Sequence, residues 1–183
     1  MGPLLQLSRW IDSLNARIGR ISAWFLLAMI GIGAFNALAR YSSRWLGADL
    51  SSNTLIEAQW YLFSAAFLLA SAHTLSQNDH VRVDVLYGRL DARKQAWIDL
   101  AGGILFLLPF CIFGVWISLE YVADSWAVWE GSPDPGGLPR YPLKTIIPVT
   151  FSLLLAQGLS ECIKRVAFLR GLLPTASGQE EAS

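Results

Sequence analysis

Four apolar segments, each long enough to cross a lipid bilayer, constrain the fold of this 183-residue chain more than any other feature. They lie at residues 21–41, 53–75, 96–122 and 141–163. The first is the clearest, because no charged residue occurs from Ile21 to Ala39 and about 20 apolar residues in a helix span the hydrocarbon core. A cleaved signal peptide is the rival interpretation, since Ala37-Leu38-Ala39 resembles a cleavage site. A signal peptide has a shorter apolar core of ~7–15 residues, so we favour a membrane span.

The composition agrees with a membrane protein. Charged residues make up 15% of the chain and hydrophobic residues 54%, whereas a soluble domain carries about 25% charge. Most of the eight tryptophans lie near the ends of the apolar segments, as in the aromatic belts at lipid–water interfaces. The formal net charge is zero, so no basic surface indicates nucleic acid as a partner. The two cysteines, Cys111 and Cys162, belong to no disulfide or zinc motif.

Residues 3–20 precede the first span and predict an amphipathic helix. Apolar residues recur there at spacings of three and four, namely Leu4, Leu7, Ile11, Leu14 and Ile18. Arg9, Asp12, Asn15 and Arg17 occupy the other side. Such a helix can lie flat in the membrane interface or pack against a helix of a partner, and we expect the interfacial placement. The predicted fold is an all-α integral membrane protein with one domain over residues 1–175 and a flexible tail at 176–183.

The lysines and arginines predict the orientation of the spans. Ten lie before the first span, between the second and third, or after the fourth: Arg9, Arg17, Arg20, Arg82, Arg89, Arg93, Lys94, Lys164, Arg165 and Arg170. Four lie on the opposite side: Arg40, Arg44, Arg140 and Lys144. Because cytoplasmic loops carry the excess of Lys and Arg, we expect both termini and the middle loop in the cytoplasm.

In the third span, Gly102, Gly103 and Pro109 permit a bend.

The chain shows no candidate for catalysis or for a cofactor. Transport or proton-relay cores place ionisable residues at mid-depth, whereas Glu57, Asp99, Glu120 and Glu161 all lie near predicted helix ends. A haem between facing helices needs axial ligands from both, but His73 is late in the second span, His80 is in the loop after it, and no other span has a histidine. We therefore expect a protein that is not an enzyme and has no catalytic residue, cofactor or metal site.

Three polar or aromatic features indicate contacts with partners or lipid. Glu57 lies about one turn inside the second span and Arg40 ends the first at the same face, so we expect these side chains to pair or to engage one neighbouring subunit. The segment His80-Val81-Arg82-Val83-Asp84 is either a solvated turn or a fixed contact with a partner or lipid headgroups. The Pro- and Gly-rich loop at residues 124–140 forms turns rather than a helix, with Trp126 and Trp129 near the membrane interface.

The sequence resembles the small membrane subunit of tripartite ATP-independent periplasmic (TRAP) transporters. Arg40-Tyr41 resembles the family's RY ending of helix one, and Glu57, Tyr61, Leu62 and Phe63 resemble its opening of helix two. Residues 80–84 are similar to its H-I/V-R-V/I-D segment. The stretches SPDPGGLPRYPLKTIIP and LLLAQGLSE resemble a branch associated with keto acids, other organic acids or mannitol-like compounds. One departure is Leu69-Ala70, where many members have Leu-Gly.

The resemblance implies a small, non-catalytic permease subunit in the bacterial inner membrane. In this family a larger subunit binds substrate and sodium and moves like an elevator, and a periplasmic protein delivers the substrate. We expect ten residues to face a partner or lipid: Arg40, Tyr41, Glu57, Tyr61, His80, Arg82, Asp84, Trp126, Trp129 and Arg140. A self-contained small oligomeric transporter and a membrane anchor of a redox complex are the alternatives.

Overall fold

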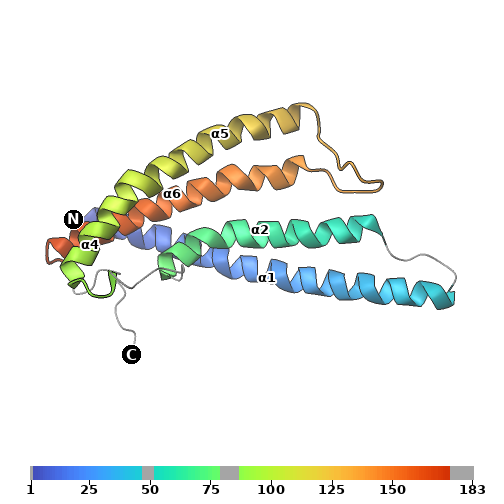
Figure 1. Cartoon of the computed structure of the whole chain (residues 1–183), viewed down its shortest axis with the longest axis horizontal. Coiled ribbons are helices and arrows are strands. Elements are labelled where there is room, and N and C mark those ends of the chain that lie inside the picture. The colour runs from blue at the N-terminus through green and yellow to red at the C-terminus, as the bar shows by residue number, and fades with distance from the viewer. Residues whose placement is uncertain (1, 47–51, 79–86, 174–183) are drawn as a thin grey trace.

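The computed structural model of the chain describes residues 2–46, 52–78 and 87–173, and these residues form helices joined by turns and loops (Figure 1). The helices are α1 (Gly2–Leu46), α2 (Asn53–Gln77), α4 (Ala92–Gly102), α5 (Leu108–Ala127) and α6 (Tyr141–Leu169). A π-helical segment, η1 (Gly103–Leu107), joins α4 to α5. Four helical segments are long and apolar enough to cross a membrane, counting α4, η1 and α5 as one. The predicted all-α fold with four spans is therefore confirmed.

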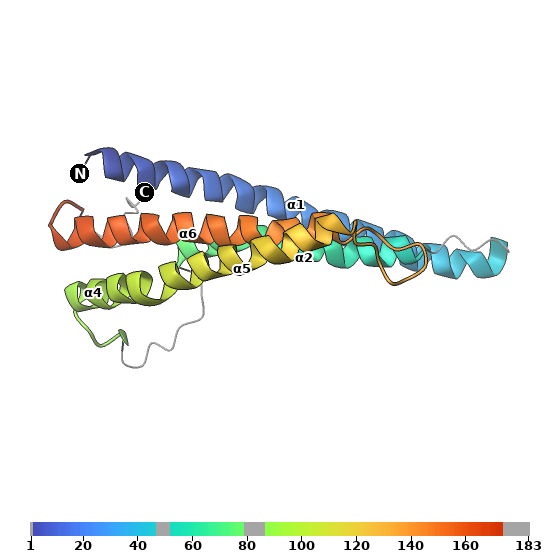
Figure 2. The ribbon, with the colours of Figure 1, turned by 90° about the horizontal axis from the view of Figure 1, so that it is seen from above.

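The helices form an elongated bundle in which α6 is the central element. It packs on α1, α2, α4, η1 and α5, and in Figure 2 it lies between α1 and α4. The start of α1, the start of α4 and the end of α6 meet at one end, here called the terminal end (Figure 1). The loop between α5 and α6 lies at the other, here called the loop end. The start of the first helix and the end of the last helix therefore lie at the same end of the bundle, as four spans with both termini on one side require.

The N-terminal segment corrects one expectation. Residues 3–20 do not form a separate interfacial helix, because α1 runs unbroken from Gly2 to Leu46 and contains both this segment and the first span. Its buried face mixes polar and apolar residues, since Ser8 and Asn15 are 1% exposed and Ile11 is 6% exposed. The exposed residues are also mixed: Leu7 and Trp10 are 48% and 64% exposed, and Arg9 and Arg17 are exposed as well. The physical reason is that the polar side chains find hydrogen-bond partners on α6, so burying them is favourable.

The third span bends where the sequence predicts. The π-helical turn at Gly103–Leu107 ends two residues before Pro109, and such a turn is a recognised cause of a helix kink. Gly103 also lies against α6, since a Cβ atom there would be 2.9 Å from the Sγ atom of Cys162. This span runs over Ala92–Ala127 rather than 96–122. Helix α6 continues to Leu169, six residues past the predicted end at 163.

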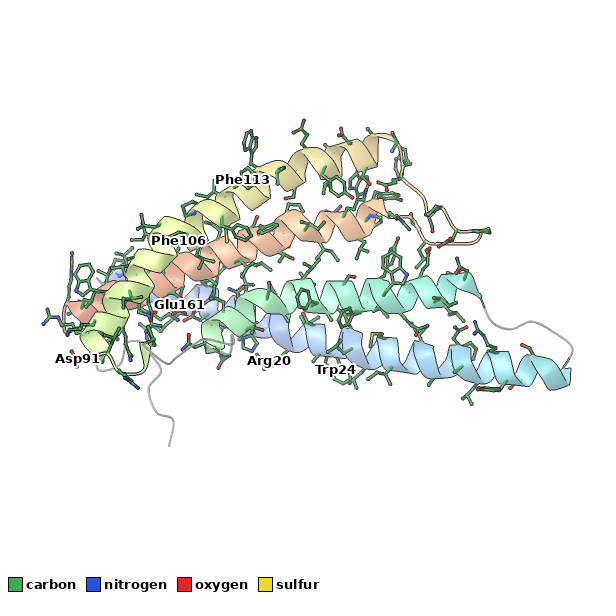
Figure 3. The ribbon with its side chains drawn as sticks, viewed as in Figure 1. Arg20, Trp24, Asp91, Phe106, Phe113 and Glu161 are labelled. Atoms are coloured by element: carbon green, nitrogen blue, oxygen red, sulfur yellow. The ribbon has the colours of Figure 1, made fainter. Side chains whose placement is uncertain are left out.

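The outside of the bundle is apolar over most of its length. Figure 3 shows Trp24, Phe106 and Phe113 on the outer surface of the helices, where they are 69%, 74% and 53% exposed. Small residues bring the helices together inside. At Gly19, for example, a Cβ atom would lie 2.5 Å from the His73 imidazole of α2. Large apolar side chains outside and small ones at helix contacts are what a membrane bundle requires.

Candidate functional site

The loop at residues 128–140 folds back over the first turns of α2, and Glu57 holds it there. The Glu57 side chain is buried, with 2% exposure. One carboxylate oxygen accepts a hydrogen bond from the Ser132 hydroxyl, and the other accepts one from the Leu138 backbone N–H at 2.5 Å. We call these three residues the Glu57 clamp. A carboxylate that accepts two such bonds fixes the path of a segment that has no regular secondary structure.

Two further hydroxyls of α2 bind the same loop. The Tyr61 hydroxyl is placed to donate to the carbonyl oxygens of Leu138 and Pro139, at 3.1 and 3.0 Å. Thr54 donates to the carbonyl of Gly136 at 2.5 Å. The first turns of α2 therefore hold this loop through side-chain contacts with its backbone.

A tight turn lets the loop approach Glu57. The Gly137 N–H donates to the Asp134 carbonyl at 3.0 Å, and Gly136 has φ +73°, a conformation that favours glycine. At Gly137 a Cβ atom would collide with Ser132 and lie 2.7 Å from a Glu57 oxygen. The Pro- and Gly-rich sequence thus forms a defined turn.

The base of the loop is closed by an ion pair. Lys144, in the first turn of α6, binds the Glu130 carboxylate, which also accepts a hydrogen bond from Ser125 at 2.6 Å. The Arg140 N–H donates to the Glu130 carbonyl at 2.8 Å. The hydrogen bonds from Lys144 and Ser125 hold the pKa of Glu130 below its usual value.

Aromatic rings surround this base. Trp126, Trp129 and Tyr141 contact one another, with ring centroids 4.4 to 5.9 Å apart. Trp126 donates from its indole N–H to Thr145 at 2.9 Å, and Trp129 is 67% exposed. The guanidinium of Arg140 lies 5.9 Å from the ring of Trp60. Clustered tryptophan and tyrosine side chains beside charged groups suit the boundary between lipid and water.

A second polar site, the terminal cluster, joins α1 to α6 at the opposite end. It consists of Asp12, Asn15, Gln157, Ser160 and Lys164. The Asp12 carboxylate accepts hydrogen bonds from Gln157 and Ser160, both at 2.8 Å, and lies 3.2 Å from the Lys164 ammonium. The Asn15 amide donates to Gln157 at 2.7 Å. Gln157 and Ser160 are fully buried, so this network of side chains holds α1 on α6, and Ser160 also lies 3.3 Å from the Ser8 carbonyl.

Ion pairs extend the terminal cluster towards α4. Lys164 also binds Glu161 at 2.5 Å, and Arg165 lies 3.3 Å from Asp99 of α4. Figure 3 shows Glu161 on α6 towards this end of the bundle. Within residues 2–46, 52–78 and 87–173, no group of three or more His, Cys, Asp and Glu side chains is placed to hold a metal ion.

Comparison with known proteins identifies the family. Residues 29–168 match the family model described as "Tripartite ATP-independent periplasmic transporters, DctQ component". The chain belongs to the DctQ family. No curated protein and no solved structure matches it. The resemblance to the small TRAP subunit is therefore confirmed, and the chain is a multi-pass component of a membrane transporter in the inner membrane.

The family match covers the two polar sites unequally. In this DctQ chain the whole Glu57 clamp lies inside the matched residues 29–168. Of the terminal cluster, Gln157, Ser160 and Lys164 lie inside, while Asp12 and Asn15 precede the match. The family model therefore covers the α6 side of the terminal cluster and not the α1 side.

Several residues expected at an interface meet at the loop end of this DctQ chain. Glu57, Tyr61, Trp126, Trp129 and Arg140 all lie there, on or beside the loop. Sequence reasoning missed Ser132 and Leu138, which supply the groups that Glu57 binds. A Ser and a Gly-Leu step in a loop carry no signal of their own until the loop's path is known.

The pairing of Arg40 with Glu57 is not formed. Both Glu57 oxygens are bound by the loop, and no Arg40–Glu57 ion pair occurs among the residues that the structure describes. Arg40 and Tyr41 are exposed on α1. The remaining expected residues, His80, Arg82 and Asp84, lie outside the described part of the chain.

Proposed function

We propose that this chain is the small, non-catalytic permease subunit of a TRAP transporter. It scaffolds a large elevator-type permease subunit and anchors it in the bilayer during sodium-coupled uptake of an organic acid, such as a keto acid. A periplasmic binding protein delivers that substrate. The proposal rests on the family and on the distribution of polar groups described above.

One observation carries the scaffold role. The Asp, Glu, Lys and Arg residues of the four spans lie towards the two ends, and no such residue occurs in 21–39, 58–77, 100–119 or 145–160. A path for ions or substrate through a bundle needs ionisable or coordinating groups at mid-depth. At the ends, the Glu57 clamp and the terminal cluster bind groups of the same chain. A bundle stiffened at both ends, with no Asp, Glu, Lys or Arg side chain between them, is suited to stay still while another subunit moves.

The absence of charged residues from the middle of the spans also bears on where sodium and substrate bind. Sodium needs several oxygen ligands, so the proposal places the sodium and substrate sites on the large subunit and requires no cofactor in this chain. The clamped loop with its exposed Trp129 is the surface we propose for contact with the binding protein. Its fixed path reduces the entropy lost on docking.

Reconstitution into liposomes tests the proposal. We expect no uptake of a 2-keto acid with this chain alone, or with the large subunit alone. Sodium-dependent uptake should appear when both subunits and the loaded binding protein are present. Solute transport by the purified chain alone would favour the self-contained transporter and overturn the scaffold role. A haem spectrum in the purified chain would instead favour the redox anchor.

A further inference from the structure

A groove between α1 and α2 remains unused by either polar site. It has a volume of about 410 Å³ and is lined by Gly33, Asn36, Ala37, Arg40 and Tyr41 of α1 and by Ile56 and Gln59 of α2. The five α1 residues are spaced at i, i+3, i+4, i+7 and i+8, so they lie on one face of the helix. The groove opens on the side of the bundle rather than into its core, since Ala37 and Arg40 are exposed.

Asn36 makes this groove unusual. The side chain is 8% exposed, its Oδ1 atom is buried without a hydrogen-bond partner, and it lines the groove. It belongs to the uncharged part of the first span, where hydrocarbon offers nothing to pair with an amide. Asn15 also leaves its Oδ1 unpaired, but its amide nitrogen binds Gln157. The Oδ1 atom of Asn36 is therefore a hydrogen-bond acceptor that lacks a donor at membrane depth.

The shape of the groove suits another helix. Ala37 has the smallest side chain on its exposed wall, and small residues let a second helix backbone approach closely. Gly33 lies deeper, where Gln59 already occupies the space: a Cβ atom at Gly33 would be 2.9 Å from its Oε1 atom. Tyr41, which lines the groove, and Leu38, the residue after Ala37, are each 67% exposed. A small, polar floor with a large apolar rim is typical of a helix–helix contact in lipid.

We infer that this groove binds a transmembrane helix of the large permease subunit, with a hydroxyl or amide side chain of that helix hydrogen-bonded to Asn36. The inference rests on the proposed function and adds the surface through which the two subunits meet. A lipid tail fills apolar space but leaves the amide unpaired. A lipid phosphate belongs at the level of Arg40, one helical turn nearer the end of the span. The groove also lies within the residues matched by the family.

Co-purification with matched variants tests this surface. Ala37→Leu fills the groove, and Ala28→Leu makes the same change on the opposite face of α1, where Ala28 is also exposed. In mild detergent we expect the wild-type chain and Ala28→Leu to retain the large subunit equally. Ala37→Leu should lower the recovered large subunit by about tenfold, because a bulky residue prevents close helix approach. Asn36→Leu should lower it by roughly severalfold, through loss of the hydrogen bond.

The outcomes separate this inference from the proposed function. If the wild-type chain does not retain the large subunit, the proposed function fails. If the wild type retains it and Ala37→Leu does so equally, the function stands and the groove is wrong. Ala37→Cys adds an independent measurement, since we expect oxidative cross-linking to a cysteine on the large subunit. Cross-linking of Ala37→Cys only to a second copy of this chain would also overturn the inference.

Discussion

The Glu57 clamp and the terminal cluster satisfy buried polar groups in different ways. At the loop end a helix side chain binds a loop, partly through the Leu138 backbone N–H. At the terminal end helix side chains bind one another, with Gln157 between Asn15 and Asp12. The first arrangement determines the shape of a surface, and the second determines how two helices dock. A change at each site should therefore disturb a different property of the protein.

The largest effect is expected for Glu57→Ala. This change leaves the Ser132 hydroxyl and the Leu138 N–H without their acceptor, so the loop should detach from α2. We expect hydrogen exchange of the Leu138 amide to accelerate on the order of tenfold to a hundredfold. Exchange in residues 8–20 should not change. The matched variant Glu57→Gln keeps one acceptor and should show a smaller acceleration. Equal protection in Glu57→Ala would mean that the clamp does not hold the loop.

Gln157→Leu should act at the other end. Leucine has a similar volume but no polar group, so Asn15 and Asp12 each lose a partner in a buried site. We expect a loss of about 1–3 kcal/mol in the free energy of unfolding, measured in detergent. Hydrogen exchange should rise in residues 8–20 and not in the loop at residues 128–140. Release of the loop by this variant would show that the two ends are coupled, and it would contradict the view that each site controls a different property.

Acidification should affect the loop end moderately. The folded pKa of Glu130 is lowered, chiefly by the hydrogen bond from Lys144. The ion pair therefore contributes its full stability above the ordinary carboxyl pKa of 4.5 and loses it as the pH falls through the lower folded value. We expect thermal stability to fall below about pH 4.5. Glu130→Gln should be less stable at neutral pH and should lose this part of the pH dependence. An identical acid profile in that variant would contradict the assignment.

Arg40→Ala should have the smallest effect on the loop. Because Arg40 forms no ion pair with Glu57, its removal leaves both oxygens of that carboxylate bound. We expect unchanged hydrogen exchange at Leu138 and an unchanged midpoint of thermal unfolding. Arg140→Ala is the informative counterpart, because Arg140 lies at the end of the loop and its guanidinium is 5.9 Å from the ring of Trp60 on α2. If Arg40→Ala released the loop, that result would support the Arg40–Glu57 pairing expected from the sequence.

The spans and the loop end were accessible to sequence reasoning for physical reasons. Length and hydropathy predict a membrane helix well, because lipid leaves few other structures possible. Pro and Gly predict the turn at 133–139, and the position of Glu57 marks it as unusual. The partners of Glu57 were not predictable, because they depend on the path of a loop whose residues carry no repeating pattern.

The terminal cluster shows what periodicity leaves undecided. The spacing in residues 3–20 separates a polar face from an apolar face, but the buried residues Ser8, Ile11 and Asn15 come from both. The partner of the polar residues is α6, where Gln157, Ser160, Glu161 and Lys164 follow one another at i, i+3, i+4 and i+7. This polar stripe inside a predicted span was the signal that Ser8, Asp12 and Asn15 have a partner within the same chain.

The unbroken course of α1 has a mechanical consequence. With 45 residues and a rise of 1.5 Å per residue, it is a rod about 68 Å long. Asp12 fastens one end of this rod to α6, and the groove around Asn36 lies towards the other. A rigid rod of this length that tilts by roughly 10° about its middle moves each tip by about 6 Å. Because α1 has no break between its two ends, a displacement of its first turns would move its other end sideways in the opposite leaflet.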